Sequence, residues 1–275
     1  MQRALASAAS RRTDAQFDSG WAELMSAFRR HHLWLWFGLL DIRMRYRRVV
    51  LGPWWVSMST AMMVGALALL YSRIFQLEVA SYLPHLAIGM VVWALISTQI
   101  SDAANAFIGF AHAIHQVRIP LPAYLLRILV RNLLMLAHNS VIVLLALIIS
   151  GTHLSPATLL VVPGLLLVCA TLFGLSLALA ILCTRYRDLQ QVVVVLLQLL
   201  FLVTPILWKP ESLGADAWLA SINPLFHLIE MVRMPTLGMA PPAASAAAAL
   251  GLCAAANLLA VWLFTRYHRK IVYWL

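Results

Sequence analysis

The sequence predicts an all-α polytopic membrane protein, and its composition and charge-free windows indicate this class. Of the 275 residues, 63% are hydrophobic and only 11% are charged, and the mean hydropathy is +0.86. A typical soluble domain has about 25% charged residues, so this chain has too few to coat an apolar interior. A soluble enzyme, a disordered protein and a fibrous repeat are therefore excluded.

We expect six transmembrane helices, because windows without acidic or basic residues reach the roughly 20 residues that a bilayer span needs. The longest such window, 132–184, holds parts of two helices, since Gly151 and Pro156 within it are typical of a turn. The expected spans are 53–73, 83–109, 123–149, 157–182, 189–208 and 244–265.

The basic residues predict that both termini are cytoplasmic. The chain has 20 basic and 10 acidic residues, which gives a net charge of +10. With both termini inside, every basic residue except Arg73, Lys209 and Arg233 lies on the cytoplasmic side, as the positive-inside rule requires. We therefore expect the surplus basic residues to face the anionic headgroups of membrane lipids, and we expect no nucleic-acid partner.

The polar ends are expected to be cytoplasmic tails, at residues 1–20 and 267–275. Between the first tail and the spans, residues 21–50 predict an amphipathic helix on the inner membrane surface, because a short run rich in Trp and Leu is flanked by arginines. This helix is either a simple anchor or a mechanical element. Its basic residues beside the first span are Arg43, Arg45, Arg47 and Arg48.

Residues 51–266 are expected to form one transmembrane domain, with an external gate-like segment at 209–243. Asn223 and Pro224 predict a helix start within that segment, since Asn is a common N-cap and Pro suits the first turn. The helix is apolar but too short to cross. It is either re-entrant, with its ends buried in protein, or a connector on the surface.

We expect this chain not to be an enzyme and to hold no cofactor or metal. Neither lysine, Lys209 or Lys270, follows a glycine, so the phosphate-binding lysine of a P-loop is missing. The cysteines Cys169, Cys183 and Cys253 lie in apolar stretches without the spacing of metal ligands. Any ATP that drives transport must therefore be hydrolysed by another polypeptide.

Asp102 is the one acid expected inside a span, eight residues before the inner end of the second helix. Inserting a lone carboxylate there into the membrane costs about 2.5–3.5 kcal/mol of free energy, so we expect it to have a partner. An antiparallel hairpin brings Arg131 of the third helix to similar depth, and we predict an Asp102–Arg131 pair. The pair is either a clip between helices or part of a proton relay.

Several short segments together resemble the ABC-2-type permeases that export polysaccharides, namely O-antigen, capsule and teichoic acid. The segments are 41–48, 51–55, 116–122, 185–189, 204–208 and 223–225. The resemblance implies a homodimer in the bacterial inner membrane, docked on two copies of a cytoplasmic ABC ATPase that hold ATP and Mg²⁺. The cargo that it implies is a lipid-linked glycan.

Each of two cytoplasmic loops is expected to have a specific role. The first loop is expected to insert into the ATPase as a coupling element, and the alternative is a plain positive-inside loop. Before the fifth span, Arg185 and Arg187 are expected to face headgroups, while Asp188 caps the helix and Gln191 completes a capping box. The coupling residues are His115, Gln116, Val117, Arg118 and Ile119.

A glycan path is expected to be lined by aromatic side chains, because a ring stacks on the apolar face of a sugar without gripping one hydroxyl pattern. The alternative is the interfacial aromatic belt of a membrane protein. Gln191 and Gln198, seven residues apart, either line the same path or bond between helices. The aromatic candidates are Tyr71, Phe75, Tyr82, Trp93, Phe107, Phe110, Phe201 and Trp208.

Three other functions are weighed. An ABC-2 exporter of drugs or small lipids is the alternative in the same class. A proton-coupled secondary transporter is disfavoured by the single intramembrane acid and the absence of detectable inverted repeats. A membrane enzyme acting on lipid-linked sugars needs clustered acids, whereas Glu211, Asp216 and Glu230 show no recognisable spacing.

Overall fold

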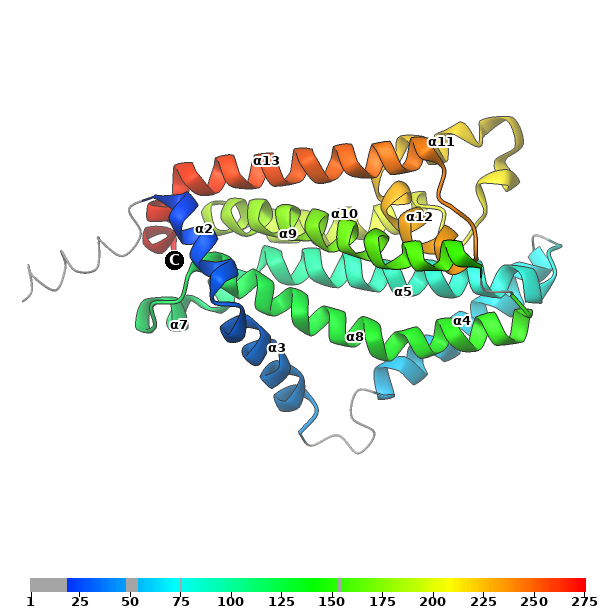
Figure 1. Ribbon diagram of the computed structural model, residues 1–275, viewed down its shortest axis with the longest axis horizontal. Helices are drawn as coiled ribbons and strands as arrows, with labels where there is room; N and C mark the ends of the chain where they lie inside the picture. Colours follow the sequence, from blue (N-terminus) through cyan, green and yellow to red (C-terminus); the bar gives the residue numbers. More distant parts are fainter. Residues whose placement is uncertain (1–18, 48–53, 75, 153–154) are drawn as a thin grey trace, which may run out of the picture.

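The computed structural model describes residues 19–47, 54–74, 76–152 and 155–275, and every regular element in these ranges is helical (Figure 1). Five of the described helices are long and apolar enough to cross a membrane, which confirms the all-α polytopic class. They are α4 (Trp54–Ile74), α5 (Val79–Ala104), α8 (Leu121–Ser150), α9 (Val161–Arg185, preceded by the short 3₁₀ helix η1, Pro156–Leu160) and α13 (Ala243–Trp274).

The fifth predicted span forms only a 15-residue helix, α10 (Leu189–Val203). At 1.5 Å per residue it is about 22 Å long, which is less than a bilayer core of about 30 Å. The helix ends because Thr204 is extended, with φ −78° and ψ 134°, and because Pro205 has no N–H to continue the ladder. The structure thus leaves the six-span count as a prediction.

One other predicted boundary is wrong, and one helix continues beyond its predicted span. The second span ends at Ala104 instead of residue 109, since the chain turns at Asn105 into the short helices α6 (Ala106–Gly109) and α7 (Ala111–Gln116). At the other end of the sequence, α13 continues unbroken to Trp274. Residues 267–274 are therefore the last turns of a long helix.

The predicted surface helix at 21–50 consists of two helices, α2 (Gly20–Arg29) and α3 (His31–Arg45), which meet at Arg30. Helix α2 is the amphipathic one, since Glu23, Leu24 and Ala27 are buried on one face. Helix α3 lies obliquely against α8 and buries only Gly38 (Figure 1). The arginine Arg48 lies outside the described residues.

The segment after α10 contains the 3₁₀ helix η2 (Pro210–Asp216), α11 (Trp218–Ile222) and α12 (Pro224–Thr236). The Asn223 side chain caps α12 by accepting a hydrogen bond of 3.0 Å from the backbone N–H of Leu225. Helix α12 is buried among α5, α9 and α13, so it turns inward as the re-entrant interpretation expects. Helix α11 exposes its three large apolar side chains, Trp218, Leu219 and Ile222, and buries Ala220.

Glycines on α9 allow this packing. A Cβ on Gly164 would lie 2.0 Å from the carbonyl oxygen of Met231 on α12, and one on Gly174 would lie 2.9 Å from the backbone of Ala256 on α13. Small residues on α9 thus serve close contacts within the chain.

The bundle has two distinct ends (Figure 1). Helices α2 and α7 and the last turns of α13 lie together at one end, which we call the basic end because Arg118, Arg185 and Arg266 are there. The η2–α12 segment and the start of α13 lie at the opposite end.

Candidate functional site

An open groove runs along the bundle between α5 and α10. It consists of a cavity of about 440 Å³ near the basic end and a second of about 660 Å³ toward the opposite end. The two cavities share Ser101 and Val194, so they are continuous. We call this feature the α5–α10 groove.

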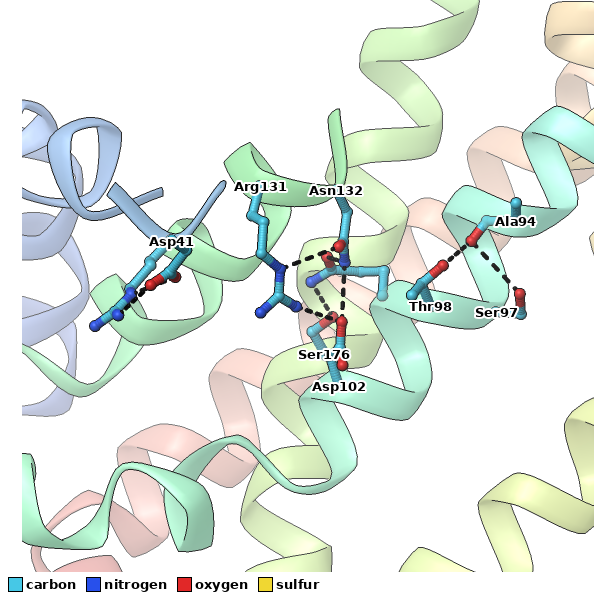
Figure 2. Close-up of polar contacts among 10 residues, drawn as sticks. Asp41, Ala94, Ser97, Thr98, Asp102, Arg131, Asn132 and Ser176 are labelled. Atoms are coloured by element: carbon cyan, nitrogen blue, oxygen red, sulfur yellow. Dashed lines mark hydrogen bonds and ion pairs between the residues drawn. The ribbon is translucent and has the colours of Figure 1, made fainter. Parts of the chain in front are cut away.

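The larger cavity combines aromatic rings with neutral polar groups. The rings of Trp93 and Phe201 are tilted by 46° with their centroids 5.7 Å apart. Ser97 and Thr98 also line it, and their hydroxyls bond to backbone carbonyls one turn earlier, including that of Ala94 (Figure 2). Trp93 is only 7% exposed, so the wall offers mainly the half-buried ring of Phe201, hydroxyl oxygens and the aliphatic side chains of Val194, Leu197 and Leu202, without a fixed charge.

The smaller cavity, which we call the basic-end cavity, contains an ion pair. Arg131 donates to Asp102 as predicted, and Asn132 donates to the same carboxylate oxygen at 3.4 Å (Figure 2). Asn132 also donates to Gln99 at 3.0 Å, and Gln99 donates to Ser176 on α9 at 3.0 Å. The network thus joins α5, α8 and α9 beneath the groove.

Asp102 lies closer to the end of its helix than the sequence predicted. Because α5 ends at Ala104, Asp102 lies in its last turn, close to the basic end. The described residues contain no group of three His, Cys, Asp or Glu side chains that could hold a metal ion. This position suits a clip between helices better than a proton relay at midplane depth.

At the opposite end, residues 204–208 leave the helix, and side chains from α5 and α12 bind their backbone. Arg233 Nη2 donates to the Pro205 carbonyl at 2.9 Å, Tyr82 donates to the carbonyl of Leu207, and His85 Nε2 lies 3.3 Å from the carbonyl of Trp208. Non-helical backbone at membrane depth needs such partners because lipid offers none.

Arg233 is the centre of this arrangement. Its side chain is only 1% exposed, and its Nη1 lies 2.7 Å from Oε1 of Glu230, three residues earlier on α12. A Cβ on Gly89 of α5 would lie 2.6 Å from Nη2, so a larger residue there would displace the guanidinium from its present position. The sequence interpretation assigned Arg233 to the external side and did not predict this pair, although two opposite charges three residues apart in an apolar helix are a usable pattern.

At the basic end, α3 is bonded to α8. Arg127 binds Asp41 through two hydrogen bonds, Nε to Oδ2 at 2.7 Å and Nη2 to Oδ1 at 2.5 Å. The guanidinium also lies over the rings of Phe37, at 5.3 Å, and Phe110, at 4.7 Å. Since Phe110 lines the basic-end cavity, Arg127 links α3 to that end of the groove, which we call its mouth.

The predicted coupling residues lie at the basic end between α7 and α8. His115 and Gln116 end α7, and the exposed Val117 and Arg118 follow, with Ile119 half-buried. The loop leads directly into α8, whose first N–H, from Leu121, donates to the Glu23 carboxylate at 2.9 Å. Burial raises the pKa of Glu23 to about 7, and the hydrogen bond from Leu121 opposes that shift.

Comparison with known proteins decides the family. The ABC-2 type transporter family matches residues 36–237, which is more than half of the chain. This chain belongs to the ABC-2 type transporter family. The permease is 24% identical over 196 residues to the O-antigen export system permease protein RfbA of Myxococcus xanthus, covering 69% of this chain and 74% of the relative. It is also 24% identical over 193 residues to a protein of the same name from Klebsiella pneumoniae, with the same coverage.

Of the aromatic candidates, the structure of the permease brings Trp93, Phe110 and Phe201 to the groove. Tyr82 and Phe107 are wholly buried in the core. Tyr71, half-buried near the end of α4, and Trp208, which donates to the carbonyl of Leu202, do not line the groove. The remaining candidate, Phe75, lies outside the described residues. Gln191 and Gln198 both line the groove, as the path interpretation of these amides expects.

The predicted cap of α10 in the permease is wrong. Asp188 occupies the N-cap position, but its side chain makes no capping hydrogen bond. Its backbone is already helical, at φ −66° and ψ −26°, whereas a capping residue is normally extended so that its side chain can reach back to the first N–H groups. Arg187 is exposed nearby, as a headgroup-facing residue should be. Arg185 is also exposed, and its guanidinium lies 4.9 Å from the ring centroid of Trp274 on α13.

Proposed function

We propose that this permease is the transmembrane subunit of an ATP-driven exporter that moves lipid-linked polysaccharide of the O-antigen or capsule type across the bacterial inner membrane. Two copies of the chain assemble with two copies of a cytoplasmic ABC ATPase, which binds ATP and Mg²⁺. The basic end and both termini face the cytoplasm. The observation that carries this proposal is the α5–α10 groove.

The groove suits an extended polar chain better than a compact apolar one. Pockets for drug-sized molecules are enclosed and cover most of the ligand. This groove is open, and its larger cavity combines the rings of Trp93 and Phe201 and aliphatic side chains with hydroxyls and an amide, those of Ser97, Thr98 and Gln198. Rings can stack on successive sugar faces while polar groups exchange hydrogen bonds with passing hydroxyls. The names of the two relatives point to the same cargo.

The contacts at the basic end support a route from the ATPase to the groove. A displacement of the 115–119 loop moves the start of α8, which Glu23 ties to α2. The same helix carries Arg127, which contacts both α3 and Phe110 at the mouth of the groove. In this proposal α3 is a mechanical element as well as an anchor.

The test is transport by the permease and its ATPase reconstituted in vesicles, with a lipid-linked O-antigen glycan as cargo. Trp93→Ala and Phe201→Ala are each expected to slow ATP-dependent glycan transfer about fivefold, since ring stacking contributes about 1 kcal/mol. The control for the loss of a ring is Trp262→Ala, which removes an exposed ring from α13, away from the groove. Because Trp93 is only 7% exposed, thermal unfolding of each variant separates lost core packing from slowed transfer.

Three outcomes would contradict the proposal. Transfer of a drug or a small lipid without any glycan transfer would favour the alternative ABC-2 cargo. Transport driven by a proton gradient without the ATPase would favour a secondary transporter. Equal loss in the Trp262→Ala control would show that ring removal acts through folding.

A further inference from the structure

A second kind of cavity lies under α2, which crosses from α13 to α8 at the basic end (Figure 1). Its volume is about 340 Å³, and its walls come from α2, α8, α9 and α13. Trp21, Leu24 and Phe28 of α2 line it, and the Phe28 ring meets that of Phe173 on α9 edge-on, with centroids 5.4 Å apart. It shares no lining residue with the α5–α10 groove. We call it the α2 cavity.

The lining of the α2 cavity suits an apolar occupant. Among the residues that line it only Asn257 carries an amide or a charge, and its Nδ2 already donates to the carbonyls of Ala170 at 3.1 Å and Cys253 at 2.8 Å. An ordered water needs two to four polar partners, which this wall does not offer. Trp21, Phe28 and Ala170 are exposed, so the cavity is open to the membrane beside the helix bundle. In a membrane the apolar molecules at hand are lipid chains.

The four helices around the α2 cavity carry charge of one sign at the basic end. Helices α8, α9 and α13 contain no acidic residue. Glu23, the one acid of α2, is buried and accepts the N–H of Leu121. Arg29 directly follows Phe28 and is exposed, as are Arg266 and Lys270 in the last turns of α13. Basic pockets between transmembrane helices on the cytoplasmic side suit anionic lipid headgroups.

From this lining and charge we infer that the α2 cavity binds one acyl chain of an anionic membrane phospholipid, with the phosphate beside the arginine end of α2. A phospholipid fits better than the lipid anchor of a cargo, because an anchor stays attached to its glycan and the cavity shares no residue with the groove. The chain packs against Leu24, and the neighbouring Glu23 caps α8 directly after the 115–119 loop. The bound lipid is thus a structural part of the contact between α2 and α8, whatever cargo is moved.

The test is native mass spectrometry of the full chain, without the ATPase, in detergent with equal amounts of phosphatidylglycerol and phosphatidylethanolamine that have identical acyl chains. One phosphatidylglycerol per chain is expected to be retained. Its complex should be about fivefold more abundant than that of phosphatidylethanolamine, which is the contribution of one arginine near a lipid phosphate.

Ala170→Phe places a ring at an exposed position of the cavity wall and is expected to lower lipid retention about tenfold. Shutting about two methylene groups out of the cavity is enough for this effect. The matched control is Ala255→Phe, at an exposed alanine of α13 that does not line the cavity, and it should retain lipid as the wild type does.

Arg29→Gln tests the headgroup contact separately. It leaves the cavity wall unchanged and is expected to reduce the preference for phosphatidylglycerol to less than about twofold. Arg73→Gln, at an exposed arginine of α4 near the opposite end, controls for the lost charge and keeps the preference.

Three results would overturn the inference. They are unchanged retention in Ala170→Phe, equal retention of the two phospholipids by the wild type, and displacement of both by an equal amount of a polyprenyl phosphate, which would assign the cavity to a cargo anchor. The first two would leave the exporter function intact, because that function is tested by ATP-dependent glycan transfer. Failure of that transfer would likewise leave the phospholipid site in place.

Discussion

Glu23 shows how a side chain from a surface helix completes a long apolar helix. The first N–H groups of α8 have no partner within the helix, and Pro122 lacks an N–H altogether. The Glu23 carboxylate accepts the N–H of Leu121, which directly follows the predicted coupling loop. The position of that loop relative to α8 is therefore set partly by α2.

The raised pKa of Glu23 predicts a pH dependence of stability. In the unfolded chain this carboxyl ionises near 4.5, and in the folded protein near 7. As pH rises between these values, the unfolded state releases its proton first, so the free energy of unfolding falls, and it levels off above about 7. Glu23→Gln, which can still accept from Leu121, is expected to flatten this fall and to be more stable than wild type above pH 7.

Thermal unfolding in nanodiscs between pH 4 and 8 measures this effect. Asp216→Asn, at an exposed acid of the opposite end, should follow the wild-type curve. A Glu23→Gln curve parallel to wild type would refute the assignment.

Single residues differ in how far the sequence reveals their partners. The Asp102–Arg131 contact is predictable, because the cost of a lone carboxylate demands a partner and the hairpin supplies a cation at similar depth. Arg127 was visible as a cation on the same helix, but its partner Asp41 is 86 residues away on a helix whose position against α8 no pattern specifies.

At the level of elements, Arg233 joins three helices. It is paired with Glu230 on α12, bonded to the end of α10 through Pro205 and packed against Gly89 of α5. Because residues 204–208 have lost their helical hydrogen bonds, these contacts replace what the helix would have supplied. The position of α12 in the bundle therefore depends on one buried cation.

Arg233→Met is expected to destabilise the permease by about 3–5 kcal/mol, because it leaves the Glu230 carboxylate buried without a partner. The double variant Arg233→Met with Glu230→Gln should recover part of this loss, since the uncompensated charge is gone. Chemical unfolding in detergent gives both values, and hydrogen exchange at residues 204–208 should rise in the single variant.

Arg73→Met, at an exposed position on α4, controls for the loss of an arginine. A double variant as unstable as the single one would contradict the charge argument.

The helix ends show which element boundaries a sequence can predict. Pro205 predicts a disturbance at the end of α10, but Trp208 was included in the span because the segment stays apolar to that residue. The end of α5 at Asn105 has neither glycine nor proline to mark it. Helix α13 runs past its basic residues to Trp274, since charges there do not interrupt a helix that leaves the bilayer.

At the scale of the whole molecule, the basic end is one connected unit. The loop at 115–119, the start of α8, α3 and the mouth of the groove are joined through Glu23, Arg127 and Phe110. An ATPase that binds this loop would move the mouth of the groove together with it.

Arg118→Glu is expected to weaken co-purification of the ATPase about tenfold or more, because it reverses a charge in the proposed contact. The measurement is the stoichiometry of the ATPase that accompanies the tagged permease from native membranes. Arg73→Glu reverses a charge at the opposite end and should leave the stoichiometry unchanged. Full recovery of the ATPase with Arg118→Glu would exclude the loop as the coupling site.

The shortness of α10 has a consequence for the lipid around the permease. Its apolar surface ends at Val203 after about 22 Å, whereas neighbours such as α8 match or exceed the bilayer core. A membrane responds to such hydrophobic mismatch by thinning locally, at a cost of fractions of a kcal/mol per Å. Thinning beside α10 would bring the two headgroup layers closest where the groove opens. A polar group still attached to its lipid would then have the shortest distance to cross.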